Sequence, residues 1–216
     1  MDLHRQFRSS GMRFISASLV LVAVLLLLVS VSHAVPIHFA VTLSGANESP
    51  PVNTPGTGTA VVTLDPTAQT LQLNINFSGL TTPTTAAHIH CCLTNPFQAG
   101  VNVGVATTVP AFPGFTLGGT SGSYSSPVFD LTQAAIYNTT PGGFVELQGG
   151  LPQAEQAFIN GVLTGRVYLN IHTTANPTGE IRGFLVATPE PASLLLLGVG
   201  LIGFAWIQRR RKFKRR

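Results

Sequence analysis

The sequence predicts an all-β fold: a Greek-key sandwich or barrel of about eight strands with one short helix, flanked by hydrophobic helices at the N- and C-termini. Three observations lead to this prediction. The central part of the chain is rich in Gly, Pro, Thr, Asn and Val, a composition that favours strands and turns over helices. Within it, short runs of alternating apolar and polar residues recur between turn clusters. A long apolar stretch stands near each end of the chain.

Residues 1–34 predict a secretory signal peptide. An unbroken apolar core at 19–29 follows a basic segment, and the small residues Ser32 and Ala34 stand where signal peptidase cleaves, so we expect cleavage after Ala34. The basic residues are Arg5, Arg8 and Arg13. The alternative is an uncleaved anchor, because residues 14–31 are long enough to span much of a bilayer.

Residues 35–188 have a length that suits one domain, and eight strands are predicted within them. The clearest is 71–78, where leucine, isoleucine and phenylalanine alternate with glutamine and asparagine. In chain order the predicted strands are Ile37–Ser44, Gly58–Leu64, Leu71–Ser78, Ala86–His90, Val101–Ala106, Ser123–Asp130, Gly165–Thr173 and Glu180–Ala187.

One helix and one hairpin complete the predicted domain. The helix covers 152–163, with Pro152 near its start and an apolar face that includes Phe158. The last two strands are expected to pair as a hairpin in which Ile171 and Ile181 are buried.

The charge distribution argues against a nucleic-acid partner. The whole chain has 12 basic and 8 acidic residues, but ten of the basic ones lie in the first 13 or the last 8 positions. Residues 35–190 contain two arginines, no lysine and seven acidic residues, a net charge of −5. Such a body has no basic patch with which to neutralise phosphates.

The predicted strand at 86–90 carries two histidines on one face. Because side chains alternate along a strand, His88 and His90 project together and Cys92 continues their row, while Ile89 faces the core. The predicted hairpin carries a second polar row, formed by Tyr168, Asn170 and His172. A tight turn at 176–179 is expected to bring Glu180 and Arg182 near His172.

Two interpretations of these histidines stay open. Three neutral imidazoles on adjacent strands suit a zinc or copper ion. Alternatively the imidazoles are structural, and they hydrogen-bond to backbone carbonyls or to Glu48, Asn170 or Glu180. No catalytic triad is legible in the sequence, so no catalytic residue is predicted.

The two cysteines, Cys91 and Cys92, are adjacent in an exported chain, and an oxidising compartment favours their oxidation. Three arrangements are open. They are a disulfide between the two neighbours, bridges to other chains, and Cys92 as a fourth metal ligand beside the histidines.

Several motifs of the body together resemble the CHRD domain family, named for repeats in the animal protein chordin. The motifs are LSGANE at 43–48, PPV at 50–52, HIH at 88–90, YLNIHT at 168–173 and GEIRG at 179–183. The resemblance covers about residues 37–187 and implies an exported β domain without an established enzymatic activity. The cysteine pair after the second histidine departs from the family pattern, in which glycine is more usual.

Residues 189–216 resemble a PEP-CTERM sorting signal. Pro189, Glu190 and Pro191 precede an apolar run at 192–207 and a basic cluster at 209–216. Such a run spans about 24 Å as a helix, and the basic cluster is expected to stay cytoplasmic. The resemblance implies membrane anchoring, then cleavage by an exosortase-type transpeptidase and transfer to the cell surface or medium. A permanent single-span anchor is the alternative.

Two classes of function follow from these observations. The first is a non-enzymatic surface or extracellular-matrix protein that binds extracellular polysaccharide or a protein partner. The second is a small copper or zinc protein, with redox-related chemistry, that uses His88, His90 and His172.

Overall fold

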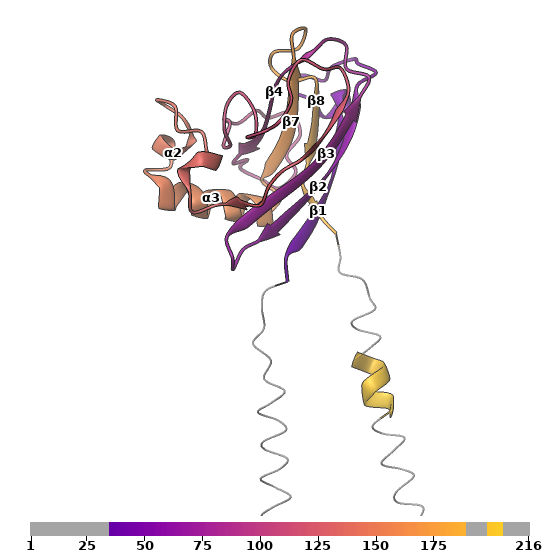
Figure 1. The fold of residues 1–216 in the computed structure, drawn as a ribbon, viewed down its shortest axis with the longest axis vertical. Helices are drawn as coiled ribbons and strands as arrows, with labels where there is room; N and C mark the ends of the chain where they lie inside the picture. The colour runs from indigo at the N-terminus through magenta and orange to yellow at the C-terminus, as the bar shows by residue number, and fades with distance from the viewer. Residues whose placement is uncertain (1–34, 189–197, 205–216) are drawn as a thin grey trace, which may run out of the picture. The chain divides into compact units, whose positions relative to one another are not determined.

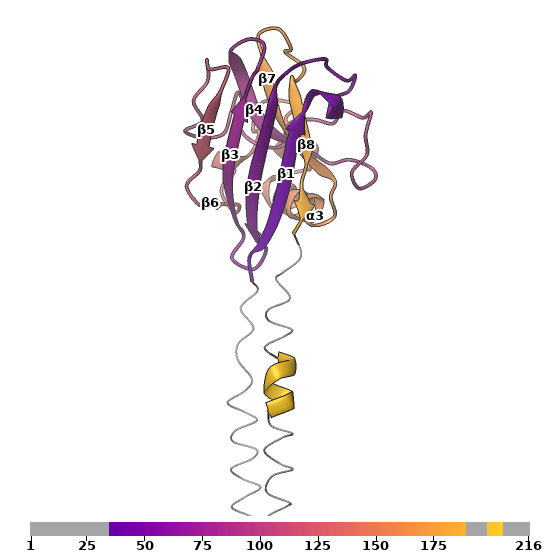
Figure 2. The same ribbon diagram turned by 90° about the vertical axis from the view of Figure 1, so that its right-hand side faces the viewer.

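The computed structural model describes residues 35–188 and 198–204. The domain is mostly β, and nine strands form one curled antiparallel sheet (Figure 1, Figure 2). Its strands are β1 (Ile37–Ser44), β2 (Thr57–Asp65), β3 (Thr70–Ser78), β4 (Thr84–Cys91), β5 (Gly122–Ser125), β6 (Phe129–Asp130), β7 (Val167–Thr173), β8 (Ile181–Phe184) and β9 (Val186–Ala187).

The strand order across the sheet is β4-β7-β8-β1-β2-β3-β5, with β6 on β3 and β9 on β1. Because β8 pairs with both β7 and β1, it joins the β4-β7 half to the β1-β2-β3 half. The result is a single curled sheet, a half-barrel, so of the two predicted architectures the sandwich with its two separate sheets is wrong and the barrel is the nearer one.

The helices of the domain are few: η1 (Gly45–Asn47), η2 (Ala134–Ile136), α2 (Phe144–Leu147) and α3 (Leu151–Leu163). The α2 and α3 helices lie together at one side of the domain (Figure 1). The α3 helix matches the predicted helix within one residue and buries Ala154, Phe158 and Val162 against the core. Gly161 faces the strands, where a Cβ would lie 3.1 Å from Val167, so the absence of a side chain lets α3 approach closely.

Three predicted strands are absent or divided in the structure. Residues 101–106 form no named strand, because this segment is held to β4 only by an isolated bridge between His90 and Val105 and by loop hydrogen bonds. The predicted strand 123–130 is divided into β5 and β6, and Pro127 lies in the gap, where it has no N–H for a ladder. The predicted strand 180–187 is divided into β8 and β9 around Leu185.

The flanking hydrophobic helices are not shown by the structure. The N-terminal one falls in residues 1–34, outside the described residues, and of the C-terminal apolar run only 198–204 are described, as a helix. Among the described residues, every helix is too short or too polar to cross a bilayer.

The β7-β8 hairpin is confirmed and lies in the interior of the sheet. Ile171 and Ile181 are direct partners in the β7-β8 register, and both side chains are fully buried.

Replacing Ile181 with alanine should therefore lower the free energy of unfolding by about 2–5 kcal/mol, through lost transfer energy and a cavity. Chemical denaturation followed by circular dichroism measures the loss. Val186→Ala is the control, because Val186 is 51% exposed and should change stability by less than about 0.5 kcal/mol; equal losses for both variants would contradict the assignment of this core.

Candidate functional site

The face of β4 and β7 opposite the hydrophobic core carries the predicted polar residues. Ala87 and Ile89 pack into the core, and alternation turns His88 and His90 to the other face. The two strands pair in antiparallel register, with His88 opposite Asn170 and His90 opposite Tyr168. His172 lies opposite Ala86 in the same ladder and shares the face of Asn170. The fold therefore places all three histidines on one side of two neighbouring strands.

The three imidazoles meet in one cluster. Their ring centroids are 4.5 Å apart for His88–His172, 4.9 Å for His88–His90 and 5.8 Å for His90–His172. One ring nitrogen from each residue lies within 4.8 Å of those of the other two. All three side chains are buried, and His90 also stacks on the Tyr168 ring at 4.7 Å.

Backbone carbonyls fix the tautomer of two of the rings. Nδ1 of His90 lies 2.7 Å from the Val103 carbonyl oxygen, and Nδ1 of His172 lies 3.0 Å from the Pro177 carbonyl oxygen. A carbonyl only accepts hydrogen bonds, so each Nδ1 carries the proton and each Nε2 keeps a free lone pair. Both Nε2 atoms are buried without a partner, as is Nδ1 of His88. Metal-binding histidines have this arrangement, in which the second ring nitrogen donates to a carbonyl.

Burial keeps the histidines neutral. It lowers the pKa of His88 to about 2, with further lowering from the neighbouring His172 and His90. It lowers the pKa of His90 to about 4, although the Val103 carbonyl opposes the shift. The pKa of His172 is also lowered by burial. Neutral imidazole is the form that binds a metal.

The lowered pKa values predict how the metal-free protein responds to acid. An unfolded histidine titrates near pH 6.5. Below that pH the unfolded chain therefore binds more protons than the folded chain, in which His88 and His90 stay neutral. The stability that they contribute is present above pH 6.5 and is lost as the pH falls toward about 4. Glu48 acts in the opposite direction, because its pKa is raised to about 7 and its folded form takes up a proton between pH 7 and 4.5.

We expect the metal-free chain to lose at least about 1–2 kcal/mol of unfolding free energy between pH 7 and pH 5, since His88 and His90 already outweigh the one carboxyl at about 1.4 kcal/mol per pKa unit and His172 acts in the same direction. Urea denaturation at a series of pH values measures this. The Glu48→Gln variant should lose stability more steeply on acidification, because the opposing proton uptake is removed. Stability that is constant or rises from pH 7 to pH 5 in both proteins would contradict the neutral, buried state of the rings.

Arg182 organises the segments that cover the cluster. This side chain is fully buried, and its Nε donates to the Asn47 carbonyl at 2.7 Å. Its Nη1 donates to the Val101 carbonyl at 3.1 Å and to Asn102 Oδ1 at 3.0 Å, and its guanidinium stacks 4.4 Å from the Tyr168 ring. One cation thus ties the loop after β1 and the 101–103 segment to the sheet. The same 101–103 segment supplies the carbonyl that orients His90.

Glu48 and Asn170 lie beside Arg182 with unused polar atoms. Glu48 Oε2 is 3.7 Å from Arg182 Nε, and both side chains are buried. Burial raises the pKa of Glu48 to about 7, while the charge of Arg182 and the amide of Asn170 oppose the rise. Glu48 Oε1, Asn170 Oδ1 and Arg182 Nη2 are buried without hydrogen-bond partners. In the described part of the chain, all six buried side-chain atoms without partners belong to these three residues and the three histidines.

Glu180, expected near the histidines, instead binds threonines. Its carboxylate accepts hydrogen bonds from the hydroxyls of Thr54 (2.5 Å), Thr81 (2.9 Å) and Thr173 (2.6 Å), and from the backbone N–H of Thr81 at 2.7 Å. Burial alone would raise the pKa of Glu180, but these hydrogen bonds outweigh it and lower the pKa. The hydrogen bonds of the Glu180 carboxylate in the structure are thus made with threonines, and Glu180 itself lies just before β8.

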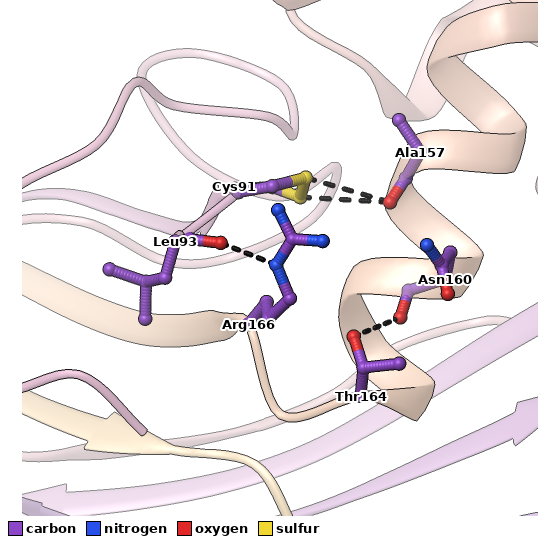
Figure 3. The surroundings of a disulfide bond; sticks show 7 residues. Cys91, Leu93, Ala157, Asn160, Thr164 and Arg166 are labelled. Carbon is purple, nitrogen blue, oxygen red and sulfur yellow. Dashed lines mark hydrogen bonds between the residues drawn. A yellow bond between two sulfur atoms is a disulfide. The ribbon is translucent and has the colours of Figure 1, made fainter. Parts of the chain in front are cut away.

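The cysteines lie on the core side of β4, away from the histidine face. Cys91 and Cys92 form a disulfide with each other. Their sulfur atoms lie 3.8 Å and 3.5 Å from the Ala157 carbonyl oxygen of α3, and Figure 3 shows this contact and the nearby hydrogen bond from Arg166 to the Leu93 carbonyl. Of the three arrangements open from the sequence, the disulfide between the two neighbours is the one formed, and Cys92 has no free thiolate with which to serve as a fourth metal ligand. Neither cysteine is left for a bridge to another chain.

Two features that support the cluster were not predicted from the sequence. The carbonyls of Val103 and Pro177 orient the rings, but a backbone acceptor leaves no mark on residue type. Asn102, which accepts from Arg182, lies in the segment predicted as a strand. The sequence contains one signal for the carbonyl that orients His172: Pro177 stands five residues after this histidine, within the predicted turn.

The fold and the cluster define a small antiparallel β domain that encloses a polar site of three histidines, an arginine, a glutamate and an asparagine. A family model of the CHRD domain matches residues 39–185, and the chain belongs to this family. A second family model, the PEP-CTERM protein-sorting motif, matches residues 187–211. The chain is thus an exported protein of the exosortase-sorted type, anchored through its C-terminus before processing. No curated protein and no solved structure matches it.

Proposed function

We propose that the chain is an exported cell-surface or extracellular-matrix protein whose CHRD domain binds one zinc or copper ion through His88, His90 and His172. The observation that carries the proposal is the convergence of three buried, unpartnered imidazole nitrogens within 4.8 Å of one another. A buried polar atom without a partner costs about 1–3 kcal/mol. A metal ion would satisfy all three nitrogens at once.

The donor set indicates which metals suit the site. Imidazole nitrogen is a preferred ligand of Zn²⁺ and Cu²⁺, whereas Mg²⁺ and Ca²⁺ take oxygen ligands. The disulfide removes thiolate from the neighbourhood, so a site of the cysteine-rich structural zinc class is not formed here. The ring nitrogens that donate to Val103 and Pro177 would hold two of the ligands in place when a metal binds.

The alternative for the cluster is a metal-free structural clasp. The two hydrogen bonds to backbone carbonyls support it in part, because they join β4 and β7 to the 101–103 and 174–179 segments. A clasp leaves Nδ1 of His88 and the Nε2 atoms of His90 and His172 buried without any hydrogen-bond partner. This is why the geometry supports the metal better than the clasp.

The route to the surface follows the two ends of the chain. We propose that signal peptidase cleaves after Ala34 and that an exosortase-type transpeptidase removes the segment after the Pro189-Glu190-Pro191 motif, so that the mature chain begins at Val35 and consists mainly of the β domain at 35–188. The PEP-CTERM match supports the second step. The acidic charge of the domain argues against nucleic acid as its partner. We propose that the domain has a non-enzymatic role and binds extracellular polysaccharide or protein. Intact mass of the protein from its native host tests the processing, and a species that retains residues 192–216 would contradict it.

Metal stoichiometry tests the proposed site. The full chain, purified in detergent with a tag that contains no histidine, is stripped with a chelator and dialysed against Zn²⁺ or Cu²⁺. We expect one ion per chain and a raised unfolding temperature in the presence of metal. Fewer than about 0.2 equivalents of both metals, with an unchanged unfolding temperature, would leave the clasp as the correct interpretation.

A further inference from the structure

The last strand of the domain, β9, pairs with the first strand. The register sets β9 opposite Phe39 and Ala40 of β1. Directly after β9, Thr188 donates to the His38 carbonyl from its backbone N–H at 2.8 Å and from its hydroxyl at 2.9 Å. The residues that lead into the sorting motif are therefore bound to the sheet by hydrogen bonds as far as Thr188.

The β9 strand can separate from β1 without opening the hydrophobic core. Leu185, the residue before β9, is fully buried, whereas Val186 is 51% exposed and both Ala187 and Thr188 are exposed. Separation of β9 therefore brings little apolar surface into water and loses mainly hydrogen bonds that water can replace. Segments with few buried contacts open locally more readily than core strands do. The buried side chain of Leu185 marks the point at which such an opening stops.

The two family models meet at this same place in the chain. The CHRD match ends at residue 185, and the match to the sorting motif begins at residue 187. Pro189 follows Thr188 directly and has no N–H with which to continue the pairing. The β9 strand thus belongs to the sheet by its hydrogen bonds and overlaps the sorting signal in sequence.

The length of chain between the sheet and the cleavage point depends on β9. With β9 paired, the three residues from Thr188 to Pro191 reach at most about 11 Å, and with β9 released, the six residues from Leu185 reach about 22 Å. The apolar run proposed as the membrane anchor begins directly after Pro191. While β9 is paired, the folded domain therefore lies within about 11 Å of the bond that the transpeptidase has to reach.

We propose that β9 leaves β1 when the exosortase-type transpeptidase binds the sorting motif, and that cleavage requires this release. The inference rests on the proposed processing and adds that residues 186–188 are part of the segment presented to the enzyme. Release supplies the extended chain that peptide-binding enzymes take up. The rate of processing then follows the population of the released form, as for other cleavage reactions that act on a locally opened chain.

A disulfide between β1 and β9 tests this requirement. The full chain is produced in its native host with Ala40→Cys and Val186→Cys, two exposed residues that are direct partners in the register. Opposite residues of antiparallel strands have Cα atoms about 4.5–5.5 Å apart, within the disulfide range of about 4.4–6.8 Å. Thiol alkylation identifies the exported chains in which this disulfide has formed, and these are followed by intact mass after protein synthesis is stopped. We expect the tied chain to lose residues 192–216 at least tenfold more slowly than the wild type.

Two further variants show whether the block arises from the release of β9. Ala40→Ser with Val186→Ser is the matched control, which cannot form the bridge and should be processed within about twofold of the wild type. A flexible spacer of six Gly and Ser residues, inserted between Thr188 and Pro189 of the tied chain, restores the longer reach and should restore processing to within about threefold of the wild type. This rescue separates a tied but folded domain from a misfolded one.

The outcomes also separate this inference from the processing on which it rests. A tied chain that is processed as fast as the serine control would overturn the required release and leave the processing standing. A tied chain that stays slow despite the spacer would also overturn it, because the block would then not come from the reach of the motif. A wild-type chain that retains residues 192–216 would overturn the processing and the inference together.

Discussion

Replacing His90 with alanine should lower the affinity of the protein for zinc and copper at least about 100-fold. Loss of an outer partner of a metal-binding histidine already costs 10–100-fold, and His90 is one of three direct ligands in the proposed site. Its Nδ1 is held by the Val103 carbonyl at 2.7 Å, so no neighbouring side chain can take its place without a new orienting contact. Competition with a chromophoric chelator measures the affinity of each protein.

His38→Ala is the control for this variant. His38 is an exposed histidine on β1 whose Nδ1 lies 3.0 Å from the Thr63 hydroxyl, far along the sheet order from β4. It removes an imidazole without touching the cluster, so metal affinity should stay within about twofold of the wild type. Equal affinities for His90→Ala and the wild type would place the metal elsewhere, and equal losses for both variants would indicate adventitious binding by exposed histidines.

Replacing Arg182 with methionine should lower the free energy of unfolding by about 3–5 kcal/mol, the range for breaking a buried ion pair from one side. The variant leaves the Glu48 carboxyl buried without its cation and frees the carbonyls of Asn47 and Val101 from their donor. Methionine keeps much of the volume of the stem, which limits the contribution of a cavity. Urea denaturation followed by circular dichroism gives the loss.

Arg166→Met is the matched control, because Arg166 is the other arginine of residues 35–190. It is partly exposed and donates from Nε to the Leu93 carbonyl, so its replacement should cost about 1 kcal/mol. A loss for Arg182→Met no larger than that for Arg166→Met would show that the covering segments do not depend on the buried cation.

Alternation in the strands predicted the histidine face well. The pattern around Ile89 placed His88 and His90 together, and β1 was predicted with its observed bounds, because apolar and polar residues alternate cleanly in both places. In the structure β4 pairs directly with β7, which sets the two predicted rows of polar residues side by side. Local periodicity is sufficient where one face of a strand is apolar and the other polar.

The segments that bury the histidine face of β4 and β7 could not be predicted from the sequence. Every residue of β7 is buried, including Tyr168, Asn170 and His172, because segments distant in the chain lie over the polar side. Residues 101–106 contain a strand-like alternation, yet their carbonyls bind Arg182 and His90 in place of a regular ladder. Such contacts depend on where loops fall in space, and a loop leaves no periodic signal.

The proposed metal site can be tested by a crystal structure of the zinc-soaked protein, with anomalous diffraction recorded on both sides of the zinc absorption edge. We expect one strong anomalous peak among His88, His90 and His172, about 2.0–2.1 Å from one nitrogen of each ring, with Nε2 as the ligand atom of His90 and His172. A cluster without an anomalous peak at saturating zinc, or a peak bound by other residues, would contradict it.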